Sequence, residues 1–473
     1  MRIDVIGAGP AGLIAARRAA QLGAQVRLFD RGEPGGMIQP ATLLDGCTID
    51  IGAEAFAVRG GAVAALIDEL GLTDEVVAPR PLPSWGYANG RAYPMPRGGF
   101  MGIPSDADAD AVAHVLSERA IAAVRAEQSL DAHVGSEATT LAELIRARYD
   151  DEVLEHLVAP VSRGVYSIDP HDVDLTAVLP GIATEIANHG SLTAVIGARR
   201  SNATPGALVN TVRGGMHRVI AALVRECTQL GVTIHTNTEI TELPNRDAAD
   251  AVIVTVTPSA KFPWLRELAH TSGITAQRDA IEAAQLAASD TVAAEVVALA
   301  VTSPELDDHP RGTGVLVAAS DAAGASGHIV RAKALTHASA KWQWLAEAAA
   351  PQHIVRLSYG PARGTSTSAQ PLTAAMADDE LLTLARADAT ELLGVSQLEI
   401  VAHGRRIWRM PAPPTRVGRP ALLEQVRRAI AAQDANPRVY ACGTWIDGTG
   451  LATVVPRAIA TAEAAVAGSP AGH

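Results

Sequence analysis

Three glycines and one acid near the start of the chain have the residue types and spacing to hold a dinucleotide. Gly7, Gly9 and Gly12 form the pattern G-x-G-x-x-G, and Asp30 follows a second apolar run. Gly7 permits a tight turn, Gly9 lets a pyrophosphate approach the backbone, and Gly12 allows close packing of helix and strand. We expect the Asp30 carboxylate to accept hydrogen bonds from ribose hydroxyls and to repel a 2′-phosphate. The motif therefore predicts FAD or NAD rather than NADP.

The elements expected around these glycines would aim them at the phosphates. A strand over Arg2–Ile6 runs into the glycines, an alanine-rich helix follows, and a second strand over Gln25–Phe29 ends at the acid. The helix N-terminus would offer free N–H groups and the positive end of its dipole. A flexible glycine loop is one alternative. A signal peptide built on the apolar run Val5–Ala16 is another, but Asp4, the glycines and the lack of an A-x-A cleavage site argue against it.

The composition of the chain narrows its function class. Its 473 residues allow two or three domains, and its three cysteines lie far apart and are odd in number. We therefore expect no disulfide framework, no metal cluster and a cytoplasmic location. A net charge of −12 and 3% aromatic residues argue against nucleic-acid binding. No apolar run reaches the ~18 residues of a membrane span, so we expect at most peripheral membrane contact.

Arginine dominates the basic residues. Among 39 Lys and Arg residues, the lysines are Lys261, Lys333 and Lys341. A GC-rich genome is a sufficient explanation, yet arginine forks also suit a substrate with several carboxylates.

Later segments extend the nucleotide-binding pattern. A helix over His217–Leu230 leads to a strand over Gly231–Thr236, and further strands are expected at Val252–Val256 and Arg438–Ala441, before a final helix at Pro456–Ala467. The fold class is therefore α/β with α+β insertions: a discontinuous Rossmann-like FAD-binding domain, a mixed-sheet substrate domain and a helical domain. The expected ranges are 1–78, 205–258 and 405–468 for the first, 79–104 and 259–404 for the second, and 105–204 for the third.

The two insertions differ in character. The first shows helical spacing over Ser105–Ala126 and Thr140–Val158, and Thr140 with Glu143 forms a capping box. The second mixes strands, expected at Thr291–Val301 and His353–Tyr359, with a helix over Asp378–Leu393.

Five segments together resemble the FAD-dependent amine-oxidase superfamily. Within it the chain is similar to the oxygen-dependent protoporphyrinogen and coproporphyrinogen oxidases of haem biosynthesis, most of all the bacterial coproporphyrinogen III oxidases. The segments are the N-terminal motif with Gly35 and Gly36, DIGAEAF (residues 50–56), APVSRGVYSIDP (159–170), VRGGMHRV (212–219) and CGTWIDGTGLATVV (442–455). The third is characteristic of the porphyrinogen oxidases, and amine oxidases generally lack it.

The resemblance implies an FAD site built from two glycine segments. The N-terminal glycine loop would hold the pyrophosphate, and the C-terminal glycine segment would hold the isoalloxazine end. For Trp408 a place in the hydrophobic core is the alternative, and a strand near Thr238–Ile240 would offer main-chain hydrogen bonds to adenine. The expected cofactor-binding residues are Gly7, Ala8, Gly9, Pro10, Ala11, Gly12, Asp30, Arg31, Gly35, Gly36, Gly52, Ala53, Glu239, Ile240, Trp408, Gly443, Gly448, Gly450 and Leu451.

The chain departs from the family pattern at two places. The family usually has Glu at Asp30 and an Arg before the double glycine. Here that link is one residue shorter, Pro34 lies near the expected Arg, and Arg31 is the candidate to compensate. The family's Pro-Gln-Tyr and Gly-His are replaced by Pro413-Pro414-Thr415 and Gly418-Arg419.

The resemblance implies a six-electron oxidation of a porphyrinogen, with O2 as acceptor and H2O2 as product. Gly314 and Leu316 would flank the macrocycle, while Arg59 and Arg97 are candidates to bind propionates; a solvated loop arginine is the alternative for Arg97. The sequence shows no acid–base pair, so no catalytic side chain is assigned. A downstream ferrochelatase is the plausible partner.

Three alternatives to a coproporphyrinogen III oxidase stay open. The polar, arginine-rich chain suits the more highly charged coproporphyrinogen III, but protoporphyrinogen IX is the second candidate substrate. Another flavin amine oxidase or desaturase is possible, although the segment around 164–169 argues against it. A catalytically silent FAD-binding homologue is the third, because the family's Gln, Tyr and His are missing.

Overall fold

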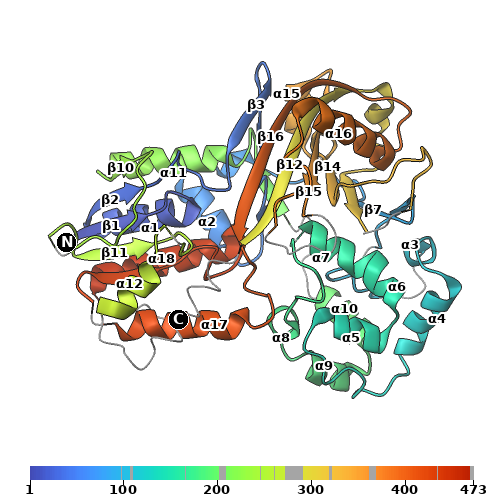
Figure 1. Ribbon diagram of the computed structural model, residues 1–473, viewed down its shortest axis with the longest axis horizontal. Coiled ribbons are helices and arrows are strands. Elements are labelled where there is room, and N and C mark those ends of the chain that lie inside the picture. Colours follow the sequence, from blue (N-terminus) through green and yellow to red (C-terminus); the bar gives the residue numbers. More distant parts are fainter. Residues whose placement is uncertain are drawn as a thin grey trace.

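The computed structural model contains three units that meet at the centre of the molecule (Figure 1). It describes residues 1–96, 99–106, 110–165, 167–201, 209–245, 247–259, 261–271, 291–318, 322–361, 369–433 and 435–468. Within these ranges, no helix has the length and apolar character to cross a membrane.

The first unit is a parallel five-stranded sheet with helices on both faces. Its strands are β10 (Thr233–His235), β2 (Gln25–Phe29), β1 (Arg2–Ile6), β11 (Ala251–Val254) and β17 (Arg438–Ala441), in that order across the sheet. One face is covered by α1 (Pro10–Gln21), α11 (His217–Gln229), α18 (Leu451–Ala467) and α2 (Ala62–Glu69). The other is covered by α12 (Trp264–Thr271) and α17 (Arg419–Ala432). The Rossmann-like fold class is thereby confirmed.

Small strands connect this unit to its neighbours. They form a hairpin, β3 (Pro40–Leu44) with β4 (Cys47–Asp50), and a three-stranded group, β5 (Phe56–Ala57), β9 (Val209–Val212) and β6 (Val76–Val77).

The second unit is a mixed seven-stranded sheet. Its order is β16 (Glu399–Pro411), β12 (Thr291–Thr302), β15 (His353–Tyr359), β14 (Ala334–His337), β13 (Gly314–Val317), β7 (Trp85–Ala88) and β8 (Arg91–Pro94). One face packs on α16 (Asp378–Leu393). The opposite face packs near β16 and β12 on the β3–β4 hairpin, α14 (Ala338–Lys341) and α15 (Gln343–Ala349). Strand β16 continues through residue 404, where a domain boundary was expected, and the domain boundaries themselves stay predictions.

The third unit is helical and has its own apolar core. Its elements are α3 (Asp110–Ala113), α4 (Glu118–Glu127), α5 (Leu141–Arg148), α6 (Asp151–Val153), a π-helical turn (Leu154–Val158), α7 (Ala159–Val165), α8 (Leu175–Val178), α9 (Ile182–His189) and α10 (Leu192–Ser201). The expected capping box is present, because the Thr140 hydroxyl accepts from the Glu143 N–H and the Glu143 carboxylate accepts from the Thr140 N–H.

Several expected element limits were wrong. The Ser105–Ala126 helix is broken, because Ser117 caps a new helix by accepting from the Ala120 N–H. The Thr140–Val158 helix is interrupted because Asp150 caps α6 through the Glu152 N–H. The last helix begins at Leu451, five residues before the expected Pro456, because Gly450 with a φ of 104° ends the preceding loop there.

Candidate functional site

The N-terminal glycines form a turn that lies directly against the start of α1. Gly7 has a φ of 103°, and a Cβ on Gly12 would lie 1.7 Å from the Gly7 carbonyl oxygen. The Thr255 hydroxyl donates to the carbonyls of Ile6 and Gly7 at 2.9 and 3.0 Å. Gly9 immediately precedes α1 and provides no side-chain cap, so N–H groups in the first turn of the helix remain open to a ligand.

Asp30 braces this loop. Its carboxylate accepts from the Ala8 N–H at 2.7 Å and from the Gly32 N–H at 2.8 Å. Each carboxylate oxygen thus uses one lone pair and can accept a further hydrogen bond. The neighbouring Arg31 is exposed and forms no hydrogen bond or ion pair with its side chain among the described residues.

The shortened link after Asp30 still returns the double glycine to the loop. The Gly35 N–H donates to the Ala8 carbonyl at 2.8 Å, and Gly36 lies so close that a Cβ there would be 3.1 Å from the Gly9 Cα. Gly35 and Gly36 have φ angles of 122° and 56°, which favour glycine at both positions. The chain therefore forms a two-sided glycine cradle from segments 7–12 and 35–36.

The expected strand at Thr238–Ile240 is wrong. Strand β10 ends at His235, and the chain then turns so that the Thr238 N–H donates to the Asp30 carbonyl at 2.7 Å. Asn237, with a φ of 52°, turns the backbone out of the strand, and the hydrogen bond keeps Thr238 beside Asp30. Glu239 is exposed and lies 3.8 Å from Lys261, and Ile240 packs against the apolar core under α12 and α17.

The C-terminal glycine segment reaches the same cradle from the other side. A Cβ on Gly443 would lie 3.1 Å from the Thr255 carbonyl oxygen and 3.5 Å from the Ala11 Cβ. Gly450 precedes Leu451, the first residue of α18, and offers no side-chain cap. Gly448, with a φ of 114°, lies beside Pro414. The segment thus supplies a second helix N-terminus next to the first.

Trp408 and Gly52 form a tight contact. The Trp408 indole N–H donates to the Ile51 carbonyl at 3.1 Å, and the side chain is 8% exposed. A Cβ on Gly52 would lie 1.9 Å from the Met37 carbonyl oxygen and 2.9 Å from the Trp408 ring. The Ala53 N–H donates to the Met37 carbonyl at 2.9 Å. Trp408 is therefore part of the apolar packing that fixes the Gly52–Ala53 backbone.

An ion-pair cluster next to this backbone was not predicted from the sequence. Glu54 accepts from Lys341 at 2.8 Å and from Arg356 at 2.5 Å, and Arg356 also donates to the Gly52 carbonyl. Burial by itself would raise the Glu54 pKa, but the two cations outweigh it and lower the pKa to about 2. Its partners lie 287 and 302 residues away in sequence, so local spacing gave no signal.

Asp50 is a second missed residue. It caps α11 by accepting from the N–H groups of Met216 and His217 at 2.6 and 3.0 Å. The DIGAEAF and VRGGMHRV segments are therefore joined by a direct contact.

The structure brings two of the expected substrate residues together. Leu316 on β13 packs against Gly164 of α7. The two residues are so close that a Cβ on Gly164 would lie 2.7 Å from the Leu316 Cδ2. Gly314 begins the same strand with a φ of 148°, and a Cβ there would meet the Leu335 carbonyl oxygen at 2.3 Å. Arg59 is exposed, just before α2, and no described contact joins it to this strand. Arg97 lies outside the described residues.

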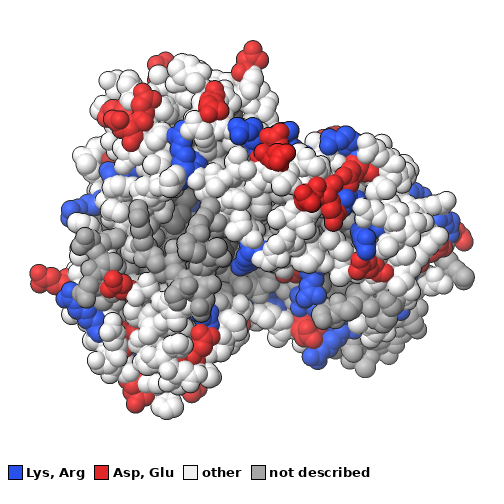
Figure 2. All heavy atoms as spheres, turned by 180° about the vertical axis from the view of Figure 1, so that it is seen from behind, with Lys and Arg blue, Asp and Glu red and all other residues white. Residues whose placement is uncertain are grey.

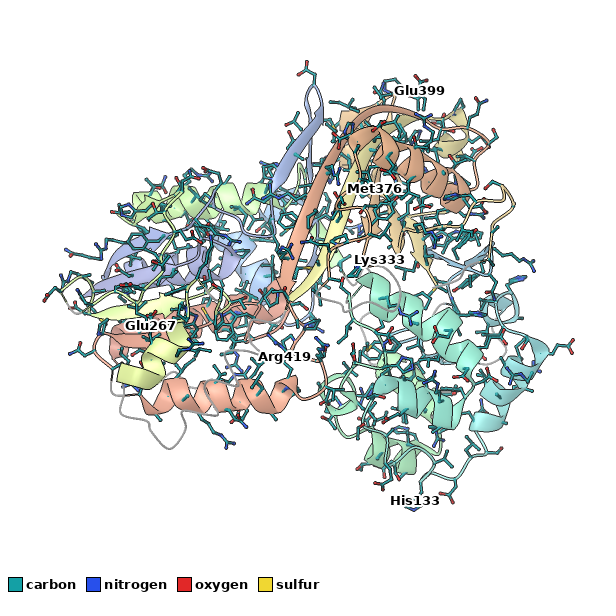
Figure 3. All side chains as sticks on the ribbon, viewed as in Figure 1. His133, Glu267, Lys333, Met376, Glu399 and Arg419 are labelled. Atoms are coloured by element: carbon teal, nitrogen blue, oxygen red, sulfur yellow. The ribbon has the colours of Figure 1, made fainter. Side chains whose placement is uncertain are left out.

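Lys333 is a further residue at this junction that sequence reasoning did not single out for the site. Figure 3 labels it where the seven-stranded sheet approaches α7. Its ammonium donates to the Ser167 hydroxyl at 2.8 Å. Burial lowers the Lys333 pKa to about 8.

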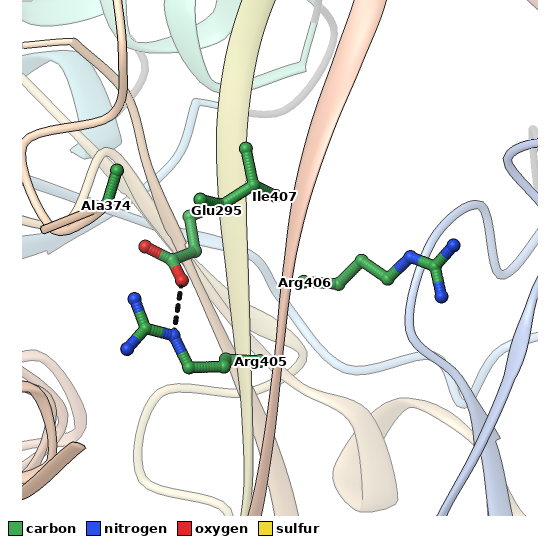
Figure 4. Close-up of a pocket in the computed structure, with 5 residues that line it drawn as sticks. All are labelled: Glu295, Ala374, Arg405, Arg406 and Ile407. Atoms are coloured by element: carbon green, nitrogen blue, oxygen red, sulfur yellow. Dashed lines mark hydrogen bonds and ion pairs between the residues drawn. The ribbon is translucent and has the colours of Figure 1, made fainter. Parts of the chain in front are cut away.

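Charged side chains in two other regions lie beside charges of the opposite sign. On the face shown in Figure 2, basic side chains are interspersed with acidic ones. A groove beside β16 is lined by Glu295, Ala374, Arg405, Arg406 and Ile407 (Figure 4). Its central pair is structural, because Glu295 accepts from Arg405 at 2.7 Å and also from the Thr373 hydroxyl. Among the described residues, no three His, Cys, Asp or Glu side chains are grouped to hold a metal ion.

The residues present fit a flavin dinucleotide. Two helix N-termini, those of α1 and α18, have no side-chain cap. Glycines between them pack so closely against neighbouring backbone that a Cβ would clash. These features suit an extended molecule with a pyrophosphate and a second polar end. Fold and site thus define a dinucleotide-dependent oxidoreductase. The chain belongs to the flavin containing amine oxidoreductase family, whose model matches residues 10–468. The family implies a flavin cofactor.

Curated relatives cover nearly the full chain. Coproporphyrinogen III oxidase from Mycobacterium leprae is 28% identical over 98% of both chains. The protein of the same name from Staphylococcus aureus is 24% identical over 98% of this chain and 99% of its own. A solved structure described as a putative protoporphyrinogen oxidase from Exiguobacterium sp. 255-15 has a TM-score of 0.77, with 22% identity over 99% of both chains. Putrescine oxidase bound to putrescine has a TM-score of 0.61 and 14% identity.

Proposed function

We propose that this protein oxidises coproporphyrinogen III to coproporphyrin III, with FAD as cofactor and O2 as the electron acceptor, in haem biosynthesis. The contact between Gly164 on α7 and Leu316 on β13 carries the proposal. It joins the segment typical of porphyrinogen oxidases to a strand expected to flank the macrocycle. The curated relatives named coproporphyrinogen III oxidase support the same substrate.

FAD, when bound, would accept two electrons in each of three rounds and pass them to O2 as H2O2. The chain's own residues would hold and orient it. The N–H groups at the start of α1 would bind the pyrophosphate, with Gly9 and Gly36 leaving room for it. Asp30 would accept from the ribose with its remaining lone pairs, and the N-terminus of α18 would favour negative charge at the other end.

The protein need not supply a dedicated acid or base. Formation of the aromatic macrocycle drives the oxidation, and its protons can leave to water or to a pyrrole nitrogen. We propose that Gly314 and Leu316 flank the macrocycle and that Arg59 and Arg97 bind propionates. The role of the protein is then to position the substrate and exclude water.

Coproporphyrinogen III is proposed over protoporphyrinogen IX because it carries four propionates rather than two. Purified protein given each porphyrinogen in turn, with porphyrin fluorescence as the readout, tests this choice. We expect faster turnover of coproporphyrinogen III. Equal or faster turnover of protoporphyrinogen IX would reject the substrate, and a flavin-loaded protein without activity on either would support the silent homologue.

We further propose that the product passes to a ferrochelatase in the cytoplasm. The three cysteines, Cys47, Cys227 and Cys442, are buried and unpaired, which suits a reducing compartment. Transfer of newly made coproporphyrin to added ferrochelatase, in the presence of a protein that traps free porphyrin, tests the partnership. Complete capture by the trap would contradict it.

A further inference from the structure

Where the large sheet meets α7, the basic residue Lys333 has no acidic partner among the residues that the structure describes. Leu316 on β13 pairs with Ala334 on β14, and Lys333 immediately precedes Ala334. A Cβ on Gly164 would lie 2.7 Å from Leu316, 3.6 Å from the Lys333 carbonyl oxygen and 3.8 Å from the Ala334 Cβ. Lys333 is thus a direct neighbour of the contact that carries the proposed function.

The ammonium of Lys333 retains bonding capacity. It has three N–H donors, and its one described partner is the neutral Ser167 hydroxyl at 2.8 Å. No carboxylate lies within ion-pair distance of it among the described residues. A partly buried cation without a counter-ion is unfavourable in the free protein and attracts an incoming anion.

Nearby cations differ in this respect. Arg163, on α7, is paired with Glu155 and Asp169 at 3.3 and 2.8 Å. Arg356, on β15, is paired with Glu54. Arg163 is neutralised by two carboxylates, and Arg356 is held by Glu54 and the Gly52 carbonyl. Within the described part of the chain, a carboxylate entering between α7 and the sheet would find in Lys333 a cation that no carboxylate holds.

We propose that Lys333 binds a carboxylate of the substrate, with Ser167 holding its ammonium in position. This inference rests on the proposed function and assigns a substrate-binding residue to it. A propionate would replace water around the ammonium and form a charge-assisted hydrogen bond in a partly buried setting. Lys333 then contributes to the preference for a substrate with several carboxylates over one with fewer.

Three variants separate this role from a structural one. Lys333→Met removes the positive charge and keeps the length of the side chain, and Lys333→Arg keeps a positive charge. Ser167→Ala removes only the hydroxyl that accepts from the Lys333 ammonium. Arg428→Met deletes an exposed cation on α17 as the control. Each is titrated with coproporphyrin III and with its uncharged tetramethyl ester, and KM and kcat are measured with coproporphyrinogen III.

We expect Lys333→Met to weaken coproporphyrin III binding and raise KM by about tenfold to a hundredfold, since a hydrogen bond to a charged group contributes about 1.5–3 kcal/mol. Binding of the ester should be unchanged, and Lys333→Arg should restore part of the affinity. Because the Lys333 pKa is about 8 in the free protein, wild-type binding should weaken as the pH rises through that value, and Lys333→Met should not follow.

Two results would overturn the proposal. Unchanged coproporphyrin III affinity in Lys333→Met is one, and the other is equal loss of acid and ester binding in both Lys333→Met and Ser167→Ala, which would make the contact a structural tether. Wild-type protein that oxidises no porphyrinogen would instead reject the proposed function, while the acid-against-ester comparison would still test Lys333.

Discussion

At the scale of single residues, a substitution at Gly9 can affect cofactor binding without affecting folding. Its φ of −69° is ordinary, and a Cβ there would have its nearest contact with the Gly36 Cα at 3.8 Å. Gly12 differs, because its Cβ would overlap the Gly7 carbonyl oxygen at 1.7 Å. The folded protein can accept a methyl group at Gly9, and the methyl group would occupy the approach path of a pyrophosphate.

We predict that Gly9→Ala folds normally but loses flavin. Its flavin content should fall at least about tenfold, and its stability without flavin should stay within about 0.5 kcal/mol of wild type. The ratio of flavin to protein absorbance and urea unfolding of the flavin-free proteins measure the two. Gly197→Ala, in α10 with nothing within 4 Å, is the control and should keep flavin. A yellow Gly9→Ala protein would contradict the cradle.

Glu54 is a carboxylate with a structural role next to the Gly52–Ala53 backbone. Its side chain is 17% exposed and forms ion pairs with both Lys341 and Arg356. The lowered pKa means that this stabilisation is complete above pH about 4.5, the ordinary value, and is lost as the pH falls towards about 2.

We predict that Glu54→Gln lowers the free energy of unfolding at pH 7 by about 2–3 kcal/mol. Its stability should also fall less steeply than that of wild type between pH 4.5 and pH 2. Urea unfolding at a series of pH values measures both effects. The control Glu424→Gln breaks an exposed pair with Arg428 and should cost less than about 0.5 kcal/mol. Parallel pH curves for wild type and Glu54→Gln would refute the role.

Prediction at the residue level succeeded where the contacting residues are close in sequence. Glycine spacing identified the turn at Gly7–Gly12, because close backbone packing there depends on residues a few positions apart. It missed Asp50, whose partners Met216 and His217 lie 166 and 167 residues away in the sequence. It also misjudged Thr238–Ile240, because the backbone turns at Asn237, where φ is 52°, and the strand ends at His235.

At the scale of elements, α7 and β13 form the wall between the helical unit and the large sheet. Sequence patterns gave β15 and α16 their observed limits, because each carries its full apolar pattern within one segment. They did not give the breaks at Ser117 and Asp150, where side-chain caps compete with continued helix.

We predict that Gly164→Ala pushes Leu316 away from α7 and raises KM for coproporphyrinogen III. The stability cost should be about 1 kcal/mol, because the atom that must move is the end of a flexible side chain. Adding Leu316→Ala should relieve the overlap, so that the double variant loses less than the sum of the two single losses. Unfolding free energies and KM values of the four proteins form the cycle. Strict additivity would mean that the two residues do not touch.

At the scale of the whole molecule, three units meet at the centre (Figure 1). The strand order β10-β2-β1-β11-β17 gathers residues from both ends of the chain into one sheet. The long strands β12 and β16 of the second unit run towards this first unit, as Figure 1 shows. The Asp174 N–H donates to the Thr415 carbonyl at 2.7 Å, so the loop that departs from the family pattern anchors the helical unit.

Such long-range assembly explains why the class of fold could be predicted while the contact between α7 and the large sheet could not. The nucleotide-binding pattern recurs in short segments with known connections. Lys333 and Ser167 lie 166 residues apart, and only the packing of α7 on the sheet brings them within a hydrogen bond.

The most direct test of the central claim is anaerobic mixing of the flavin-loaded protein with coproporphyrinogen III while the flavin absorbance is followed. The account predicts that the substrate bleaches the oxidised flavin and that admitted O2 restores it, with three H2O2 formed for each coproporphyrin III. A flavin that stays oxidised in the presence of coproporphyrinogen III would contradict it.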